Sequence, residues 1–218
     1  MNEKAVRNPL SEQVYKYILR RVRQGVITPG ERINIEAIAK EFGTSRTPVR
    51  EAIGMLSQAG FVEQRHLSGP RVVDFNVKTA IDLVEYYNIL FSNVLSYIRP
   101  SDHEVLLTHL EKTLSSHRRA YEDHDDETCF EQSIQFHVNI ISFCSNTYLK
   151  NAALLAQRQL EICESRYQQK SGMQLKSIED HALILDFLRR SDWDGFVQAI
   201  TEHNETALHF FQQLDLAS

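Results

Sequence analysis

The chain of 218 residues lacks the features that would place it in a membrane or outside the cell. It has no run of 18 apolar residues, which excludes a helix long enough to span a bilayer. Its N-terminal segment has no apolar stretch of the kind that secretory signals carry. Its cysteines are odd in number and have no C-x-x-C spacing, which indicates buried thiols in a reducing compartment: Cys129, Cys144 and Cys163. We therefore expect a cytoplasmic protein with no membrane partner.

The overall excess of acidic residues is distributed unevenly. Residues 1–75 hold 12 Lys and Arg against 8 Asp and Glu, a net charge of +4. Residues 76–218 hold 12 against 21, a net charge of −9, and the two parts together give −5. A basic part favours contact with phosphates, whereas DNA would repel the acidic remainder. Length and charge together predict two domains, residues 1–75 and 76–218.

Two short apolar stripes with helical spacing lie between Asn34 and Gln64, with a turn at Gly43 between them. The start of the second stripe carries hydroxyl and guanidinium groups: Thr44, Ser45, Arg46, Thr47 and, one turn further on, Arg50. The first turn of a helix has unpaired N–H groups and the positive end of the helix dipole, which suit a phosphate. Arginine can also pair with O6 and N7 of guanine. The pattern predicts a helix-turn-helix whose second helix reads DNA.

The flanking segments complete a winged version of this motif. Residues 10–24 predict a helix that packs behind the reading helix, and residues 61–64 predict a strand. Val72, Val73 and Phe75 predict its partner strand. The loop between them, residues 65–71, holds two arginines, His66 and Gly69, which suit a wing on the phosphates or in the minor groove.

Residues 10–75 resemble the winged helix of the GntR family of bacterial transcription regulators. The matching marks are Pro29-Gly30, the string from Ser45 to Ala52 (SRTPVREA), Leu56 with Gly60-Phe61-Val62, and Gly69. The family's usual G-V-S before the arginine is Gly43-Thr44-Ser45 here. The resemblance implies that Arg46 and Arg50 contact DNA and that Gly69 forms the tip of the wing.

From about Thr79 onward the patterning is helical. It predicts helices at about 79–98, 101–123, 127–143, 147–169, 177–190 and 192–213, with a loop at Ser171-Gly172. Three starts have the spacing of capping boxes, led by Ser101, Ser177 and Ser191. Short loops between amphipathic helices predict an antiparallel bundle. The predicted fold class is mainly α: a winged helix-turn-helix of three helices and a small β-hairpin, then an all-α antiparallel bundle.

The helical part resembles the FCD effector domain of the FadR subfamily within the GntR family. The resemblance rests on the helix count and on these positions: Phe136-His137, Ser145-Asn146, Asp180-His181, Ile184, Leu188 and His203. In that subfamily an Asp and three His bind a divalent metal, and a small carboxylate effector often completes the coordination. The resemblance implies that His137, His181 and His203 bind a divalent ion such as zinc or nickel. The family Asp is Ser133 here, one helical turn before His137.

Further residues bear on the effector. The subfamily often has Arg-x-x-Leu-Glu on the first bundle helix, where this chain has Tyr87-Asn-Ile-Leu-Phe91. An aromatic wall of Tyr86, Tyr87 and Phe91 would favour a monocarboxylate with an apolar portion over a small dicarboxylate. The candidate effector contacts are Ser133, Tyr87, Phe91 and Arg158. We expect four other histidines to be solvated: His103, His109, His117 and His124.

These features predict a ligand-responsive transcription regulator rather than an enzyme. It would bind, as a homodimer, a double-stranded DNA operator with two related half-sites, and its helical domain would bind a small effector such as an organic acid. Two alternatives keep DNA binding: a metal-free effector domain with an apolar ligand, and a nucleoid-like binder with no effector. A third belongs to another class, a metal-dependent hydrolase, because three His with an open position resemble a catalytic zinc site.

Overall fold

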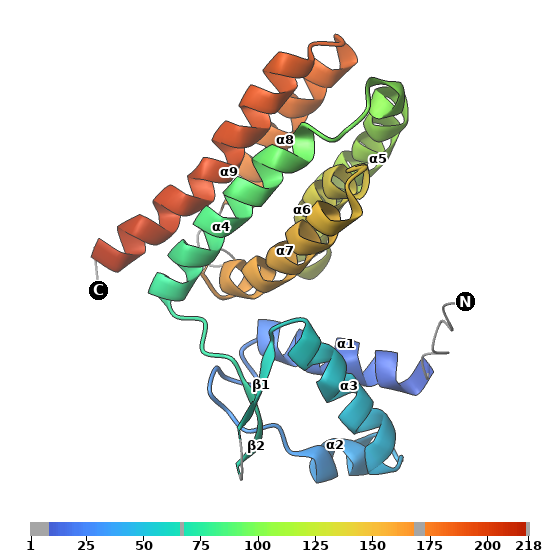
Figure 1. The fold of residues 1–218 in the computed structure, drawn as a ribbon, viewed down its shortest axis with the longest axis vertical. Helices are drawn as coiled ribbons and strands as arrows, with labels where there is room; N and C mark the ends of the chain where they lie inside the picture. Colours follow the sequence, from blue (N-terminus) through green and yellow to red (C-terminus); the bar gives the residue numbers. More distant parts are fainter. Residues whose placement is uncertain (1–8, 66–67, 168–172, 217–218) are drawn as a thin grey trace. The chain divides into compact units, whose positions relative to one another are not determined.

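The computed structural model describes residues 9–65, 68–167 and 173–216 and divides into two compact units, residues 1–75 and 76–218 (Figure 1). The first unit contains α1 (Pro9–Arg23), α2 (Ile35–Glu41), α3 (Arg46–Gln58), β1 (Val62–Arg65) and β2 (Gly69–Val72). The two strands pair antiparallel, with Val62 opposite Val72 and Arg65 opposite Gly69. Among the described helices, none is long and apolar enough to cross a membrane.

Local signals in the sequence account for α2 and α3. The side chain of Asn34 caps α2 by accepting a hydrogen bond of 3.0 Å from the N–H of Ala37. Gly43 has a φ of +60°, which a glycine adopts without the cost of a Cβ, and so it permits the turn. The apolar stripe of α3 is buried and packs against α1, with Val49 and Ala52 fully enclosed. This packing leaves the opposite side of α3 free.

The second strand starts earlier than the sequence pattern predicted. Gly69, Pro70 and Arg71 belong to β2, whereas the sequence placed them in the loop. The backbone of residues 31–33 runs along the other side of β2, because the N–H of Ile33 donates to the carbonyl of Pro70 at 2.9 Å. The N–H of Val72 likewise donates to Glu31 at 3.0 Å. Pairing with a distant segment thus extends the strand through a Gly-Pro pair.

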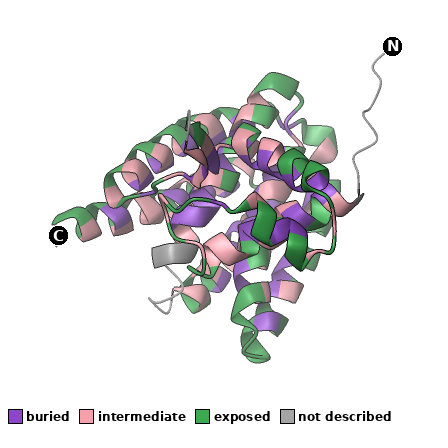
Figure 2. Cartoon of the chain, turned by 90° about the horizontal axis from the view of Figure 1, so that it is seen from below, coloured by how far each residue is buried: buried purple, intermediate pink, exposed green. Residues whose placement is uncertain are grey.

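The described part of the second unit is entirely helical, which confirms the predicted fold class. It contains α4 (Val77–Leu95), a 3₁₀ turn (Pro100–Asp102), α5 (His103–Glu122), α6 (Asp126–Ser142), α7 (Thr147–Tyr167), α8 (Gln174–Arg189) and α9 (Trp193–Leu216). The closest pairs are α5 with α6, α4 with α7 and α9, and α8 with α9 (Figure 1). Figure 2 shows buried residues on one side of these helices and exposed residues on the other. The predicted loop at Ser171-Gly172 lies outside the described residues.

The three predicted capping boxes are wrong. A 3₁₀ turn precedes α5, and α8 begins at Gln174, so that Ser177 lies inside the helix. At α9 the carboxylate of Asp192 accepts from the N–H of Gly195 at 2.9 Å, one residue later than Ser191. An aspartate beside the serine offers a charged acceptor, which favours it as the cap. The three cysteines are buried free thiols.

Candidate functional site

The N-terminal end of α3 presents its polar residues to solvent. Ser45 occupies the N-cap position with extended backbone, and its side chain makes no capping hydrogen bond. Ser45, Arg46, Thr47 and Arg50 are exposed and Thr44 is half-buried, whereas Pro48 and Val49 point into the core. The Arg46 guanidinium lies 3.3 Å from the Glu36 carboxylate, and both side chains are 61% exposed. Such an exposed pair is weak, so Arg46 can exchange Glu36 for another acceptor.

The wing residues are placed only in part, because His66 lies outside the described residues. Gly69 is the first residue of β2, pairs with Arg65 and has a φ of +77°. A Cβ at Gly69 would lie 3.4 Å from Nε of Arg32. Arg71, which the sequence assigned to the wing loop, donates from Nη1 to the carbonyl of Gly30 at 2.8 Å. Arg71 therefore holds the base of the hairpin to residues 30–33.

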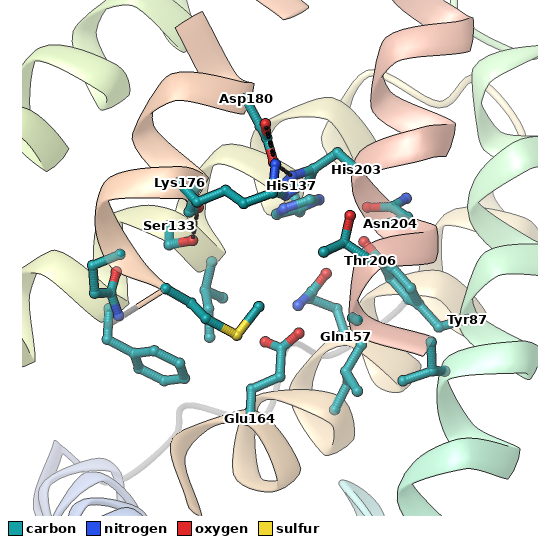
Figure 3. A pocket seen from close by; sticks show the side chains of 18 of the residues that line it. Tyr87, Ser133, His137, Gln157, Glu164, Lys176, Asp180, His203, Asn204 and Thr206 are labelled. Carbon is teal, nitrogen blue, oxygen red and sulfur yellow. Dashed lines mark hydrogen bonds and ion pairs between the residues drawn. The ribbon is translucent and has the colours of Figure 1, made fainter. Parts of the chain in front are cut away.

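The three histidines of the predicted metal site come together from three helices. His137 lies on α6, His181 on α8 and His203 on α9, and one nitrogen of each lies within 4.8 Å of the others. The rings of His137 and His203 stack with centroids 5.2 Å apart, and His181 stacks on Phe136 at 3.9 Å. Figure 3 shows His137 and His203 side by side at one end of a cavity.

Burial keeps two histidines of this cluster neutral. Desolvation lowers the pKa of His137 and of His181 well below the usual 6.5, and the nearby imidazoles add to the effect. Both ring nitrogens of His181 and Nδ1 of His137 are buried, with no hydrogen-bond partner in the part of the chain that the structure describes. Neutral imidazoles with unpaired nitrogens are the form in which histidine binds a metal.

Asp180 orients the third histidine. His203 donates from Nδ1 to Oδ2 of Asp180 at 3.1 Å, which leaves Nε2 free for another partner. Burial alone would raise the pKa of Asp180, but hydrogen bonds from His203 and Lys176 outweigh it and hold that pKa below its usual value. A carboxylate behind a histidine fixes the tautomer and the ring orientation at metal sites. Sequence reasoning did not assign this role to Asp180.

The donor set fits a divalent ion such as zinc or nickel. Three nitrogens no more than 4.8 Å apart lie within about 2.8 Å of a common point, whereas zinc binds imidazole at roughly 2.0–2.1 Å, so the rings must close by less than about 1 Å. Ser133 does not replace the family carboxylate, because its Oγ shares a 3.0 Å hydrogen bond with Oγ of Ser177. A four-coordinate ion held by these three histidines would leave one coordination position for a ligand.

His117 was predicted to be solvated, and the structure shows that this is wrong. It is 0% exposed, its Nε2 lies 3.4 Å from Oε1 of Gln174, and its ring centroid lies 5.7 Å from that of His181. Desolvation lowers its pKa to about 4. His103 is also sheltered, since it stacks on Trp193 at 4.0 Å. The burial of His117 could have been predicted from its helical spacing to the buried Leu110 and Leu114 on α5. The adjacent Arg118 and Arg119 made this stretch resemble an exposed surface.

A cavity adjoins the histidine cluster. The space open to the centres of water-sized atoms in this cavity is about 70 Å³. Its lining consists of Met173 and of residues from α4, α6, α7, α8 and α9. Ser133 and Tyr87, two of the candidate effector contacts, line it. Phe91 is buried behind Tyr87 and His137, Arg158 is exposed, and Tyr86 is 49% exposed. Of the three aromatic residues that the sequence suggested, Tyr87 is the one that lines the cavity.

Polar residues that the sequence did not single out form much of the remaining lining. They are Asn88, Gln157, Glu164, Gln174, Lys176, Ser177, Asp180, Asn204 and Thr206. Glu164 is half-buried and has no hydrogen-bond or ion-pair partner among the described residues. Burial raises its pKa to about 8. Gln157 and Glu164 are seven residues apart on α7, which is the spacing of residues on one buried helix face. Two polar residues at this spacing could have indicated a polar cavity.

Comparison with known proteins identifies the class. Residues 10–72 match "Bacterial regulatory proteins, gntR family", and residues 96–206 match the FCD domain. The chain belongs to the GntR family, in its FadR-like subgroup with an FCD domain, and is therefore a DNA-binding transcription regulator and not an enzyme. The hydrolase alternative is thereby excluded.

Individual relatives agree with this assignment. The chain is 26% identical over 199 residues to the HTH-type regulator YdhC of Bacillus subtilis, covering 89% of this chain and 88% of YdhC. It is 28% identical to the Exu regulon transcriptional regulator of Escherichia coli, covering 90% and 82%. A GntR regulator structure from Rhodococcus sp. RHA1 superposes with a TM-score of 0.76 at 16% identity, covering 94% of this chain and 99% of that one, which supports the fold.

Proposed function

We propose that this chain is a homodimeric regulator whose helical domain binds a small organic acid through a divalent ion on His137, His181 and His203. The observation that carries the proposal is the convergence of three imidazoles, of which those of His137 and His203 line one cavity. A divalent ion bound there would supply a positive charge and an open position for a carboxylate oxygen. Ser133 adds no negative charge, so the ion would keep its full +2 charge and attract that oxygen strongly.

The homodimer is supported by exposed apolar residues on two helices that pack together. Tyr86, Ile89 and Tyr97 lie on or just after α4, and they are 49%, 63% and 46% exposed. Tyr148 and Leu155 on the neighbouring α7 are 91% and 39% exposed. Apolar residues grouped on adjacent elements are typical of a surface that a partner covers.

DNA binding by a dimer implies an operator with two related half-sites. The exposed start of α3 in each copy would contact one half-site, and the protein would act in the cytoplasm. In such an assembly the effector would act by favouring one arrangement of the two copies. A ligand shifts that equilibrium only by the difference in its affinity for the two arrangements. The cavity is lined by five helices of the second unit, so its closure around a ligand can shift those helices relative to one another.

The metal part of the proposal is tested on the full chain after removal of metal with a chelator. Zinc at about 100 times its Kd should stabilise the protein by about 2.7 kcal/mol in a thermal-shift assay. His203→Ala should abolish this gain, whereas His209→Ala, an exposed histidine on the same helix, should retain it. Equal zinc stabilisation of both variants would contradict the proposed site.

A further inference from the structure

We infer that the end of the cavity away from the histidines is a hydroxyl-binding subsite, formed by Tyr87, Asn88, Gln157 and Glu164. The ligand it would take is a short polyhydroxylated monocarboxylate. This inference rests on the proposed function, since the carboxylate of the same ligand would lie at the histidine end.

The two ends of the cavity differ in chemistry. Gln157 and Glu164 extend from α7 toward the histidines from the opposite side, while Tyr87 lies on α4 (Figure 3). The histidine end carries the nitrogens and the Asp180–Lys176 pair, with Nζ to Oδ1 at 2.9 Å. The opposite end, which we call the α7 end, carries the amide of Gln157 and the carboxyl group of Glu164, with the phenol of Tyr87 on the α4 side. A ligand that spans the cavity therefore meets metal-binding groups at one end and hydrogen-bonding groups at the other.

Several polar atoms of residues that line the cavity are buried. Oη of Tyr87, Oδ1 of Asn88 and Oε1 of Gln157 have no hydrogen-bond partner among the described residues, and Tyr87 and Gln157 are only 2% and 3% exposed. Buried polar atoms without partners are costly, and native proteins seldom leave them so. Their presence along a cavity indicates that a ligand, or the water it displaces, completes their hydrogen bonds.

The charges at this end favour hydroxyls over a second carboxylate. Lys176 is the one Lys or Arg among the described lining residues, and Asp180 already engages it. Removal from bulk water keeps the Glu164 carboxyl largely protonated at neutral pH, so it can donate a hydrogen bond. A hydroxyl both donates and accepts, which matches a neutral carboxyl, a phenol and amide oxygens together. Among the described lining residues, a second anionic group would find no cation that is not already engaged.

The size of the cavity sets the length of the ligand. A space of about 70 Å³ for the centres of water-sized atoms holds several waters, so the cavity suits a small ligand. A hydroxy acid of about four to six carbons is such a ligand. The aromatic or long apolar body that the sequence suggested is less well matched, because the α7 end would then leave its polar atoms unpaired.

Isothermal titration of the zinc-loaded full chain with matched pairs of acids tests the inference. The probes are gluconate against hexanoate, xylonate against pentanoate, and threonate against butanoate, with adipate as a dicarboxylate. At least one polyhydroxy acid should bind about 100-fold more tightly than its unsubstituted match and than adipate. If every hydroxylated acid binds no better than its match, or adipate binds best, the inference is wrong.

Two variants separate the subsite from the metal site. Tyr87→Phe and Gln157→Leu should each weaken the polyhydroxy acid by about 10-fold and leave the binding of its unsubstituted match unchanged. Asn151→Ala, at an exposed position on the same helix as Gln157, serves as the control and should change neither. Unchanged binding of the polyhydroxy acid in both subsite variants would overturn the hydroxyl-binding inference and leave the proposed metal site unaffected. Absence of zinc binding by the wild-type chain overturns the proposed function, and the inference with it.

Discussion

The Glu164→Gln substitution should stabilise the metal-free protein, by an amount that grows with pH. Burial raises the Glu164 pKa from 4.5 to about 8. Below pH 4.5 the carboxyl is protonated in both the folded and the unfolded chain. As the pH rises toward 8, the unfolded chain releases this proton while the folded chain retains it, so the free energy of unfolding falls. Glutamine has the same shape and stays neutral, so the variant escapes this loss.

The shift sets the size of the effect. A change of 3.5 pKa units corresponds to at most about 5 kcal/mol at pH 9, and residual contact with water reduces it. We expect the melting temperature of Glu164→Gln to exceed that of the wild type by about 5–10 °C at pH 9 and by little at pH 5. Burial also raises the pKa of Tyr87 well above 10, so Tyr87 does not titrate in this range.

Differential scanning calorimetry between pH 5 and 9 measures this difference directly. The histidines titrate equally in both proteins, so their contribution cancels when the two profiles are subtracted. Glu179→Gln, at an exposed position on α8, is the matched control and should follow the wild type throughout. A difference between Glu164→Gln and wild type that stays constant with pH would refute the reasoning.

Three further predictions concern the reading helix, the buried histidines and the α8–α9 crossing. Arg46→Ala and Arg50→Ala should each weaken the binding of DNA selected by the wild type by about 1–3 kcal/mol, measured by fluorescence anisotropy, and leave the melting temperature unchanged. Full affinity in both variants would rule out α3 as the helix that reads DNA. Metal-free protein should lose stability as the pH falls from about 6.5 toward 4, because unfolding exposes histidines that then bind protons, and a flat profile in urea titrations would contradict their burial. Gly195→Ala should lower the free energy of unfolding by about 1–3 kcal/mol, because a Cβ there would overlap Phe187, whereas Gly54→Ala on α3 meets no atom within 4 Å and should not destabilise.

The positions of α2 and α3 followed from the sequence because the signals that define them are local. Apolar spacing, the Asn34 cap and the turn at Gly43 each act within a few residues, and they place α2 and α3 where the pattern predicted. The extent of β2 did not follow, because its pairing with residues 31–33 involves a segment almost 40 residues away. Gly69 and Pro70 carry the composition of a loop, and only that distant pairing makes them a strand.

The histidine cluster followed from a resemblance, whereas the remainder of the cavity did not follow from the sequence. His117 was taken for a surface residue because charged neighbours outweighed its place in the apolar stripe of α5. Asp180 and Lys176 resemble an exposed pair one helical turn apart until α9 brings His203 beside them. The pKa of Glu164 is raised because the surrounding helices enclose its carboxyl group, and no local sequence pattern predicts that enclosure.

Anomalous diffraction at the zinc edge, from crystals of the zinc-loaded full chain, tests the central claim most directly. The account predicts one strong peak about 2.0–2.1 Å from a ring nitrogen of each of His137, His181 and His203, with Nε2 as the ligand atom of His203. It also predicts that the peak disappears in His203→Ala crystals grown under the same conditions. No peak among these histidines, in crystals that hold zinc elsewhere, would contradict the claim.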